Sequence, residues 1–338
     1  MAITDQTTTD APVCVIIAAM NAGATIRRAV RSALEQPEVA EVVVVDDGSS
    51  DDTAARAASE EDGSGRLRIV SLPENRGPSF ARNRAIDVSR SDLLAILDAD
   101  DFILPGRFRR LLNHAEPWDF IADNIVLIDS AKADQPVDVA ALAEDAQTLT
   151  TVEFINGNIS TPGIERAEIG FLKPVFRRAF LDRHGLRYDE GMRLGEDYDL
   201  YVRALASGAR YRVIRSCGYG ATVRADSLSS RHRTQDLKAL YEADRRIKER
   251  YTLTSEEADA LKRHEESIKA RYELRRFLDR KKEVGLPTAG IELLARPRAL
   301  WPVVVGVVRD KRQASSARGA KAAPAALPRY LLPARAAD

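Results

Sequence analysis

The segment LLAILDADD, residues 93–101, is the most informative part of this 338-residue sequence. Its first five residues are wholly apolar and are followed at once by carboxylates, a pattern that predicts a short buried strand. Open α/β sheets bind their ligands beyond the carboxyl ends of the strands. Asp98 and Asp100 leave such a strand on the same side, and their oxygens suit a hard cation such as Mg²⁺ or Mn²⁺. The alternative is an acidic turn that caps the next helix.

Strand and helix signals alternate from Val13 to Leu97, which is the pattern of βαβ units. Short apolar runs predict the strands, and the segments between them have the periodicity of helices. The predicted strands span 13–17, 41–46, 67–72 and 93–97, and the predicted helices span 25–36, 52–60 and 78–88. We therefore predict an α/β fold class with a mainly parallel, Rossmann-like sheet.

The rest of the chain gives a more mixed pattern. It predicts strands at 119–128 and 210–215 and helices at 178–184 and 198–207, both helices ending at a glycine. A charged helical region follows, in which Thr254–Glu257 forms a capping-box signature. The expected domains are a flexible N-terminus at 1–11, the α/β domain at 12–233, a C-terminal helical extension at 234–295, and a basic, partly apolar tail at 296–338.

Composition excludes several function classes. Lysine plus arginine and aspartate plus glutamate are equal at 51 each, so no global positive field attracts nucleic acid. The two cysteines, Cys14 and Cys217, form neither a disulfide framework nor a metal-ligand spacing. The N-terminal residues lack a basic and an apolar region, which argues against a secretory signal, and no stretch has the ~20 apolar residues of a membrane span. These features predict a cytoplasmic protein.

The tail combines an apolar block at Leu300–Val308, which contains Trp301, with flanking arginines and lysines. Such a block can lie in the headgroup region of an anionic membrane, which would make the contact peripheral. The alternative is a last core strand followed by a disordered, alanine- and proline-rich tail.

Polar motifs follow the predicted strands in order. They are AAMN at 18–21, DDGSSDDT at 46–53, NRGPSFARNRA at 75–85 and DADD at 98–101. Because parallel strands present their carboxyl ends at one edge, these motifs predict a nucleotide site with a metal. Arg76, Arg82 and Arg84 could supply positive charge to a diphosphate, although each is also compatible with a solvated helix surface.

The series V-x-V-I-I-x-A-x-N, V-V-D-D-G-S-x-D-x-T, N-x-G-x-x-x-A-R-N-x-A and L-D-x-D-D resembles the inverting family 2 glycosyltransferases of the GT-A fold. The resemblance covers residues 13–102, and the motif GEDYDLY at 195–201 extends it to about Tyr211. Within the family, the chain is most similar to the glucosyltransferases of succinoglycan-type exopolysaccharide assembly. The resemblance implies a GT-A fold with a C-terminal helical extension.

The resemblance also implies how a UDP-sugar donor is bound. Asp46 would hydrogen-bond the uracil or its ribose, and Asp98 would lie on the ribose or metal side. Ala19, at the end of the first strand, and Arg82 belong to the same donor site. Many family members have tyrosine at the position of Met20, where an aromatic ring stacks on the base, so this chain departs from the family there.

The remaining roles concern the metal and the base. Asp100 would be the direct ligand of Mn²⁺ or Mg²⁺, with Asp98 and His232 as further candidates, and Asp197 would be the general base. Acids at a helix N-terminus also complement the helix dipole, which is the alternative for Glu196 and Asp197. A histidine in a basic stretch is commonly just exposed, which is the alternative for His232.

Together these features predict a metal-dependent inverting glycosyltransferase that transfers one hexose, glucose from UDP-glucose. The expected acceptor is an oligosaccharide on a polyprenyl diphosphate at the inner face of the cytoplasmic membrane, in exopolysaccharide biosynthesis. The absence of a Q-x-x-R-W motif favours single addition over processive synthesis. Two alternatives remain: a non-catalytic sugar-nucleotide-binding scaffold, and a nucleotidyltransferase, for which the expected glycine-rich basic loop is missing after the first strand.

Overall fold

The computed structural model describes residues 13–132, 135, 137, 139, 145–160, 168–223, 233–317 and 329–333, with backbone alone for 309–317. The chain divides into two compact units. An α/β unit comprises Met1–Thr150, Ile169–Arg224 and Pro328–Asp338, and a helical unit comprises Thr151–Glu168 and Ala225–Leu327.

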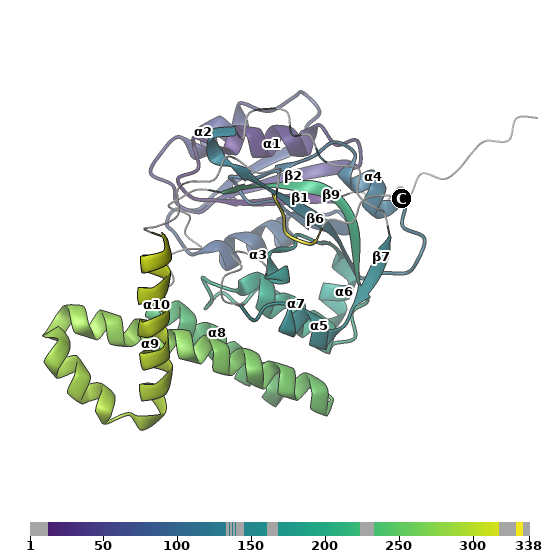
Figure 1. The fold of residues 1–338 in the computed structure, drawn as a ribbon. Helices are drawn as coiled ribbons and strands as arrows, with labels where there is room; N and C mark the ends of the chain where they lie inside the picture. The colour runs from purple at the N-terminus through teal and green to yellow at the C-terminus, as the bar shows by residue number, and fades with distance from the viewer. Residues whose placement is uncertain are drawn as a thin grey trace, which may run out of the picture. The chain divides into compact units, whose positions relative to one another are not determined.

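The first half of the α/β unit is a run of βαβ units, as predicted (Figure 1). Its four parallel strands have the order β3-β2-β1-β4. The strands are β1 Val13–Ala19, β2 Val39–Asp46, β3 Leu67–Ser71 and β4 Leu93–Ile96, and the helices between them are α1 Ile26–Leu34, α2 Thr53–Ala58 and α3 Pro78–Val88.

The second half continues the same sheet in the order β4-β8-β6-β9-β5. β8 runs antiparallel to β4 and to β6, whereas β6 and β9 are parallel. The strands are β5 Phe102–Ile103, β6 Phe120–Asp129, β7 Ala146–Leu149, β8 Val175–Arg177, β9 Tyr211–Val223 and β10 Arg329–Tyr330. The helices are α4 Arg107–Leu112, α6 Arg178–His184 and α7 Glu196–Ala206, with 3₁₀ turns η1 Ser130–Lys132 and η2 Ile169–Phe171.

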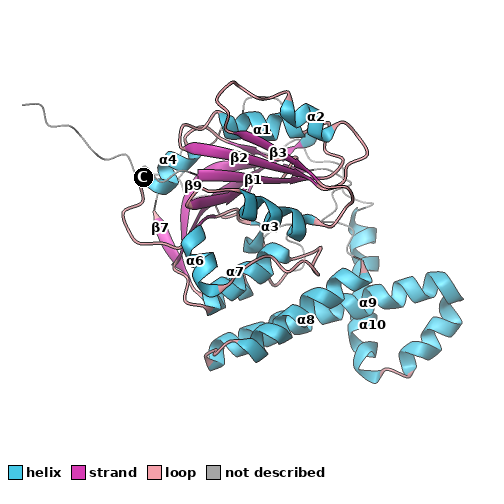
Figure 2. Ribbon diagram, turned by 180° about the vertical axis from the view of Figure 1, so that it is seen from behind, coloured by secondary structure: helices cyan, strands magenta, loops and turns pink. Residues whose placement is uncertain are grey.

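The core lies on both faces of this sheet. Figure 2 shows α1 and α2 over one face and α3, α6 and α7 over the other. Because both faces are covered, the central strands are continuous apolar runs instead of alternating ones. Every residue of 13–17 is fully buried, and residues 93–97 are at most 1% exposed. The α/β class and the mainly parallel sheet are therefore confirmed.

The longest strand, β9, extends well beyond the predicted 210–215. It continues to Val223 through Gly218 and Gly220, which in a sequence favour a turn or a break. Here both glycines allow close packing, because a Cβ at Gly218 would collide with Arg107 and one at Gly220 would collide with Phe102. Glycine is therefore needed at these two positions because buried side chains approach the backbone closely, and not because the chain turns there.

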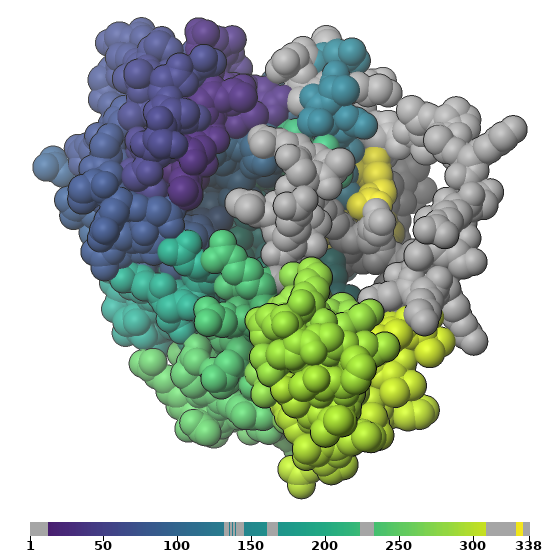
Figure 3. Space-filling view, turned by 90° about the vertical axis from the view of Figure 1, so that its left-hand side faces the viewer, coloured from purple at the N-terminus to yellow at the C-terminus, as the bar shows by residue number. Residues whose placement is uncertain are grey.

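The helical unit contains α5 Thr151–Asn156, α8 Thr234–Arg250, α9 Ser255–Leu294 and α10 Pro297–Ala317. The capping box at Thr254 and Glu257 opens α9 as predicted, and a non-helical Gly285 interrupts it before Pro287. Helix α10 packs on α9 where Gly306 meets Leu274, and Figure 3 shows these helices in yellow-green and yellow.

The structure differs from the predicted boundaries in three places. Residues 151–168 group with the helical unit, and β10, within the predicted tail, pairs with β6 of the α/β unit. The block at 300–308 is helical, so the expected alternative of a last core strand is wrong. No helix in the described part of the chain is both long and apolar enough to cross a bilayer.

A buried ion pair ties α4 to β6. Arg107 Nε donates to Asp123 Oδ1 over 3.0 Å, and both side chains are at most 1% exposed. Arg107→Met would leave the Asp123 carboxylate buried without its counter-charge, so we expect the free energy of unfolding to fall by about 3–5 kcal/mol in urea titrations. The matched control is Arg56→Met, which breaks an exposed pair with Asp52 and should lower the free energy of unfolding far less, because solvent screens that pair. Equal small losses in both variants would contradict the assignment.

Candidate active site

The carboxyl ends of β1 and β2 bring two predicted donor residues together. Ala19 and Asp46 are register partners in the parallel pair, and the carbonyl of Ala19 accepts a hydrogen bond from the N–H of Asp47 over 2.8 Å. The Asp46 carboxylate is largely buried and accepts from the N–H of Ser49 at 3.2 Å. This turn is therefore a fixed feature of the sheet edge.

Asp47 organises the neighbouring loop, a role that sequence reasoning missed. Its buried carboxylate accepts from the side-chain amide of Asn75 and from the N–H groups of Arg76 and Gly77, at 2.7–2.8 Å. Gly77 has a φ of 95°, which favours glycine, and it directly precedes α3. Asp47 thus sets where α3 begins. The D-D-G and N-R-G motifs could both be recognised in the sequence. Their contact with each other could not.

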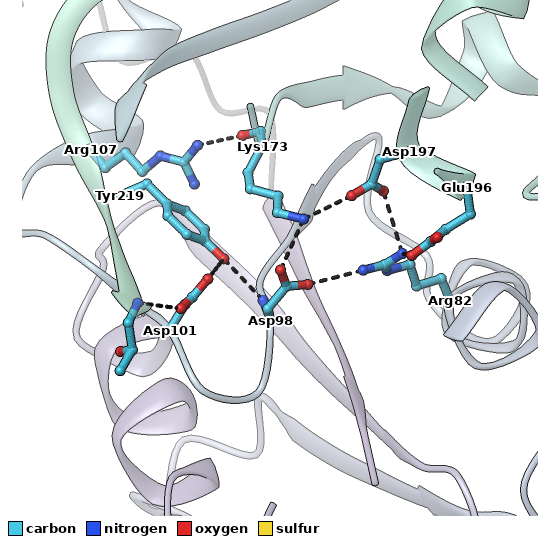
Figure 4. Close-up of polar contacts among 9 residues, drawn as sticks. Arg82, Asp98, Asp101, Arg107, Lys173, Glu196, Asp197 and Tyr219 are labelled. Atoms are coloured by element: carbon cyan, nitrogen blue, oxygen red, sulfur yellow. Dashed lines mark hydrogen bonds and ion pairs between the residues drawn. The ribbon is translucent and has the colours of Figure 1, made fainter. Parts of the chain in front are cut away.

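Arg82 on α3 lies in the middle of a carboxylate cluster (Figure 4). Its guanidinium reaches Asp98 at 3.0 Å, Glu196 at 2.7 Å and Asp197 at 3.4 Å, and its side chain is only 6% exposed. The structure therefore brings three predicted site residues together from α3, the end of β4 and the start of α7. Two neighbouring candidates, Arg76 and Arg84, are exposed instead.

Lys173 is the second cation of this cluster, and sequence reasoning missed it. Its Nζ lies 3.0 Å from Asp98 Oδ2 and 2.8 Å from Asp197 Oδ2. Strand register explains its position, because β8 pairs antiparallel with β4, with Val175 opposite Ala95. In this antiparallel register Lys173, two residues before Val175, lies opposite Leu97, two residues after Ala95. Lys173 is therefore beside the end of β4. A single lysine before a proline carries no motif, so no sequence signal pointed to it.

The cluster fixes the protonation of its members. Burial acts to raise the pKa of Asp98, but the positive charges of Lys173 and Arg82 outweigh it and lower the pKa to about 2. Burial acts to lower the pKa of Lys173, and the carboxylates of Asp197 and Asp98 outweigh it and raise the pKa. Asp98 and Lys173 therefore stay charged at neutral pH.

Tyr219 of β9 holds the backbone at the end of β4. Its hydroxyl accepts from the N–H of Asp98 at 3.1 Å and donates to Asp101 Oδ2 at 2.9 Å. The N–H of Thr222 donates to the other Asp101 oxygen at 2.8 Å. Burial, together with the charges of Asp98 and Asp100, raises the pKa of Asp101. Asp101 is thus a buried anchor that joins β4 to β9.

The residues present fit a metal that is held jointly with a diphosphate. Both Asp98 oxygens are engaged by cations, and Asp100 supplies the second carboxylate of the predicted pair two residues further along the chain. Among the described residues, no group of three or more His, Cys, Asp or Glu side chains could hold an ion alone. Mg²⁺ commonly binds through one or two carboxylates plus substrate phosphates, which agrees with this donor set. His232 lies outside the described residues.

Asp197, the candidate base, lies in the first turn of α7, after Gly195 in the left-handed conformation. Its side chain is 13% exposed, with Oδ2 on Lys173 and Oδ1 facing Arg82. Burial and the Asp197 charge raise the pKa of the adjacent Tyr188, which keeps its phenol protonated. A carboxylate in an active site can act as a general base that accepts a proton from a hydroxyl group.

Removing one hydroxyl tests the anchor on Asp98. Tyr219→Phe removes the donor to Oδ2 of Asp101 and the acceptor for the N–H of Asp98, so we expect a loss of about 1–3 kcal/mol in the free energy of unfolding. The control is Tyr241→Phe in the helical unit, because the Tyr241 hydroxyl makes no hydrogen bond with described residues. Urea unfolding of both variants measures the difference, and equal stabilities would show that the Tyr219 hydroxyl contributes nothing.

Comparisons with known proteins agree with this geometry. A sequence model described as "Glycosyl transferase family 2" matches residues 14–181. Succinoglycan biosynthesis protein ExoU of Rhizobium meliloti (strain 1021) is 53% identical over 332 residues, which cover 96% of each chain. Succinoglycan biosynthesis protein ExoO of the same organism is 36% identical over 70% of this chain and 68% of that protein.

Solved structures show the same fold. S. aureus TarS 1–349 in complex with UDP-GlcNAc matches with a TM-score of 0.56 and 21% identity, covering 79% of this chain and 72% of that chain. The complex of the same TarS fragment with UDP matches with a TM-score of 0.53 and 20% identity over the same shares. The expected GT-A-like architecture with C-terminal helices is thereby confirmed. This chain belongs to glycosyl transferase family 2.

Proposed function

We propose that this glycosyltransferase is metal-dependent and inverting, and that it transfers a hexose, glucose from UDP-glucose, to a lipid-linked oligosaccharide in succinoglycan-type exopolysaccharide biosynthesis. One observation carries the proposal: Asp98, just after β4, and Asp197, in the first turn of α7, contact the same two cations. The names of ExoU and ExoO support the pathway, and the UDP complexes of TarS support a uridine diphosphate donor.

The donor would lie along the edge formed by β1, β2 and β4. Asp46 and Ala19 would contact the uridine, and Asp98 would contact the ribose side. Met20 is 51% exposed at the end of β1, and the Asn75 amide lies 2.8 Å from its sulfur. A thioether can pack on a base through its polarizability, which would replace the tyrosine ring of other family members.

Transfer would proceed as a single displacement at the anomeric carbon. The acceptor oxygen forms a bond to that carbon while the bond to the diphosphate oxygen breaks, and UDP leaves with the electron pair. Asp197 takes the proton of the acceptor hydroxyl, and the charge of Arg82 lies beside the departing group. A divalent ion on Asp100, when bound, would supply further neutralisation of the diphosphate. Attack opposite the leaving group inverts the anomeric centre.

A panel of UDP-sugars with Mn²⁺ or Mg²⁺ tests this function through release of UDP. We expect release from UDP-glucose, abolition by EDTA and recovery on adding metal. Asp197→Asn should lower the rate by about 10²–10⁴-fold while calorimetry shows retained UDP binding. The matched control, Asp259→Asn at an exposed position of α9, should leave the rate unchanged. A full rate of UDP release by Asp197→Asn would contradict the assignment of Asp197 as the base. No UDP release by the unmodified chain, together with unchanged polysaccharide output of cells that produce Asp197→Asn, would favour the non-catalytic scaffold.

The acceptor's lipid carrier would place the protein at the inner face of the cytoplasmic membrane, and α10 offers a surface for this contact. Residues at i, i+3, i+4 and i+7 of a helix lie on one face. Four such residues of α10 are exposed apolar side chains: Trp301 at 75%, Val304 and Val305 at 44% each, and Val308 at 45%. The opposite side of the helix, with Ala299 and Val303, is buried. Exposed Arg298 adds a cation that an anionic surface would attract.

The double variant Trp301→Gln, Val305→Gln tests the membrane contact without changing charge. Because it removes two apolar side chains, we expect binding to phosphatidylcholine–phosphatidylglycerol vesicles to weaken by at least about tenfold in cosedimentation assays. Vesicles of phosphatidylcholine alone are the control for the cationic contribution. Point variants are preferable to truncation after Ala295, which would also remove β10 from the sheet. Unchanged vesicle binding would remove the membrane proposal.

A further inference from the structure

Lys173 lies at the centre of the site and has no role in the proposed reaction so far. It lies between η2 and β8 and is 5% exposed, and its ammonium contacts one oxygen of Asp98 and one of Asp197. Burying a lysine in this way is costly unless it is paired, and here two carboxylates pair with it. Its position therefore reflects the need to bring these two acids together.

The backbone of Lys173 is fixed on both sides. Its carbonyl accepts a hydrogen bond from Nη2 of the fully buried Arg107, which also holds Asp123 of β6. Pro174 follows it, and a residue before proline is restricted to extended conformations. Figure 4 shows Arg107 beside Lys173 and the lysine side chain directed at Asp98 and Asp197. The ammonium is thus aimed from a rigid base.

The two cations of the cluster make their shortest contacts with different carboxylates. Arg82 makes its shortest contact with Glu196 at 2.7 Å and reaches Asp197 only at 3.4 Å. Lys173 makes the short contact with Asp197, at 2.8 Å. Without Lys173, the Asp197 carboxylate would lose its shorter ion pair and keep the 3.4 Å contact with Arg82, so its rotation would be less restricted.

We propose that Lys173 is a positioning residue of the glycosyl transfer, which holds the Asp197 carboxylate at a fixed place relative to Asp98. The inference rests on the proposed function, because Asp197 must act as the base. The ammonium contacts Oδ2 of Asp197, while Oδ1 faces Arg82 at 3.4 Å, so the carboxylate is held from both sides. Displacing a reacting group by about 1 Å can lower a rate by about 10²-fold, which sets the size of the expected effect.

A double-mutant cycle on UDP release from UDP-glucose, with water as acceptor, tests this role. Lys173→Met should lower kcat by about 10²-fold and change the KM for UDP-glucose by less than about tenfold. In the Asp197→Asn background the same substitution should change kcat by no more than about threefold, because the base that it positions is already gone. Lys173→Arg, which keeps the charge, should recover at least about tenfold of the loss.

Lys262→Met, at an exposed position of α9, is the control and should match the unmodified chain. If Lys173→Met does not fold, Lys173→Gln takes its place as the single variant. The double variant with Asp197→Asn also removes the buried negative charge that Lys173 neutralises, so it is better balanced than Lys173→Met alone. Equal losses in both backgrounds, or an unchanged kcat for Lys173→Met, would overturn the inference while leaving the proposed function intact. No UDP release by the unmodified chain from any UDP-sugar would overturn both.

Discussion

The structure depends on the balance of charge where β4 ends. The fold directs Asp98, Glu196 and Asp197 toward one another, and such a group of carboxylates is stable only with cations between them. Arg82 and Lys173 provide that balance from two different elements. They differ in kind, because the planar fork of arginine can hold three carboxylates at once, whereas lysine acts as a compact point charge. This difference explains why Arg82 contacts three carboxylates, whereas Lys173 contacts one oxygen each of Asp98 and Asp197.

The sheet brings these groups into contact through its change of direction. Four parallel strands place the donor-side residues at one edge, and β8 then enters antiparallel beside β4. That register carries Lys173 to the end of β4, while β9 reaches across to anchor Asp98 and Asp101 through Tyr219. The parallel half therefore carries the donor-side residues of the proposed nucleotide site. The antiparallel half supplies the second cation and the anchor, and both depend on buried, hydrogen-bonded groups.

The sequence predicted the parts of the site that are local and repetitive. Apolar runs ending in polar motifs located β1 to β4, and those motifs identified Asp98 and Arg82 as candidates. The resemblance to family 2 glycosyltransferases added Asp197. Contacts between segments that are distant in the sequence could not be predicted in this way. Lys173 precedes a proline and belongs to no motif. Its place in the site follows from the pairing of β8 with β4, which the sequence does not reveal. Asp47 adjoins the predicted Asp46, and nothing local distinguishes a ligand contact from a loop anchor. Gly218 and Gly220 concealed the length of β9, because a glycine that allows close packing looks like one that ends a strand.

The central claim is that the edge formed by β1, β2 and β4 binds a nucleoside diphosphate together with a divalent ion. Anomalous diffraction from crystals grown with Mn²⁺ and UDP tests it most directly. We predict a manganese peak between the Asp100 carboxylate and the diphosphate, with the uridine against Asp46 and Ala19. Nucleotide bound elsewhere on the chain, or bound at this edge with no manganese peak beside Asp100, would contradict it.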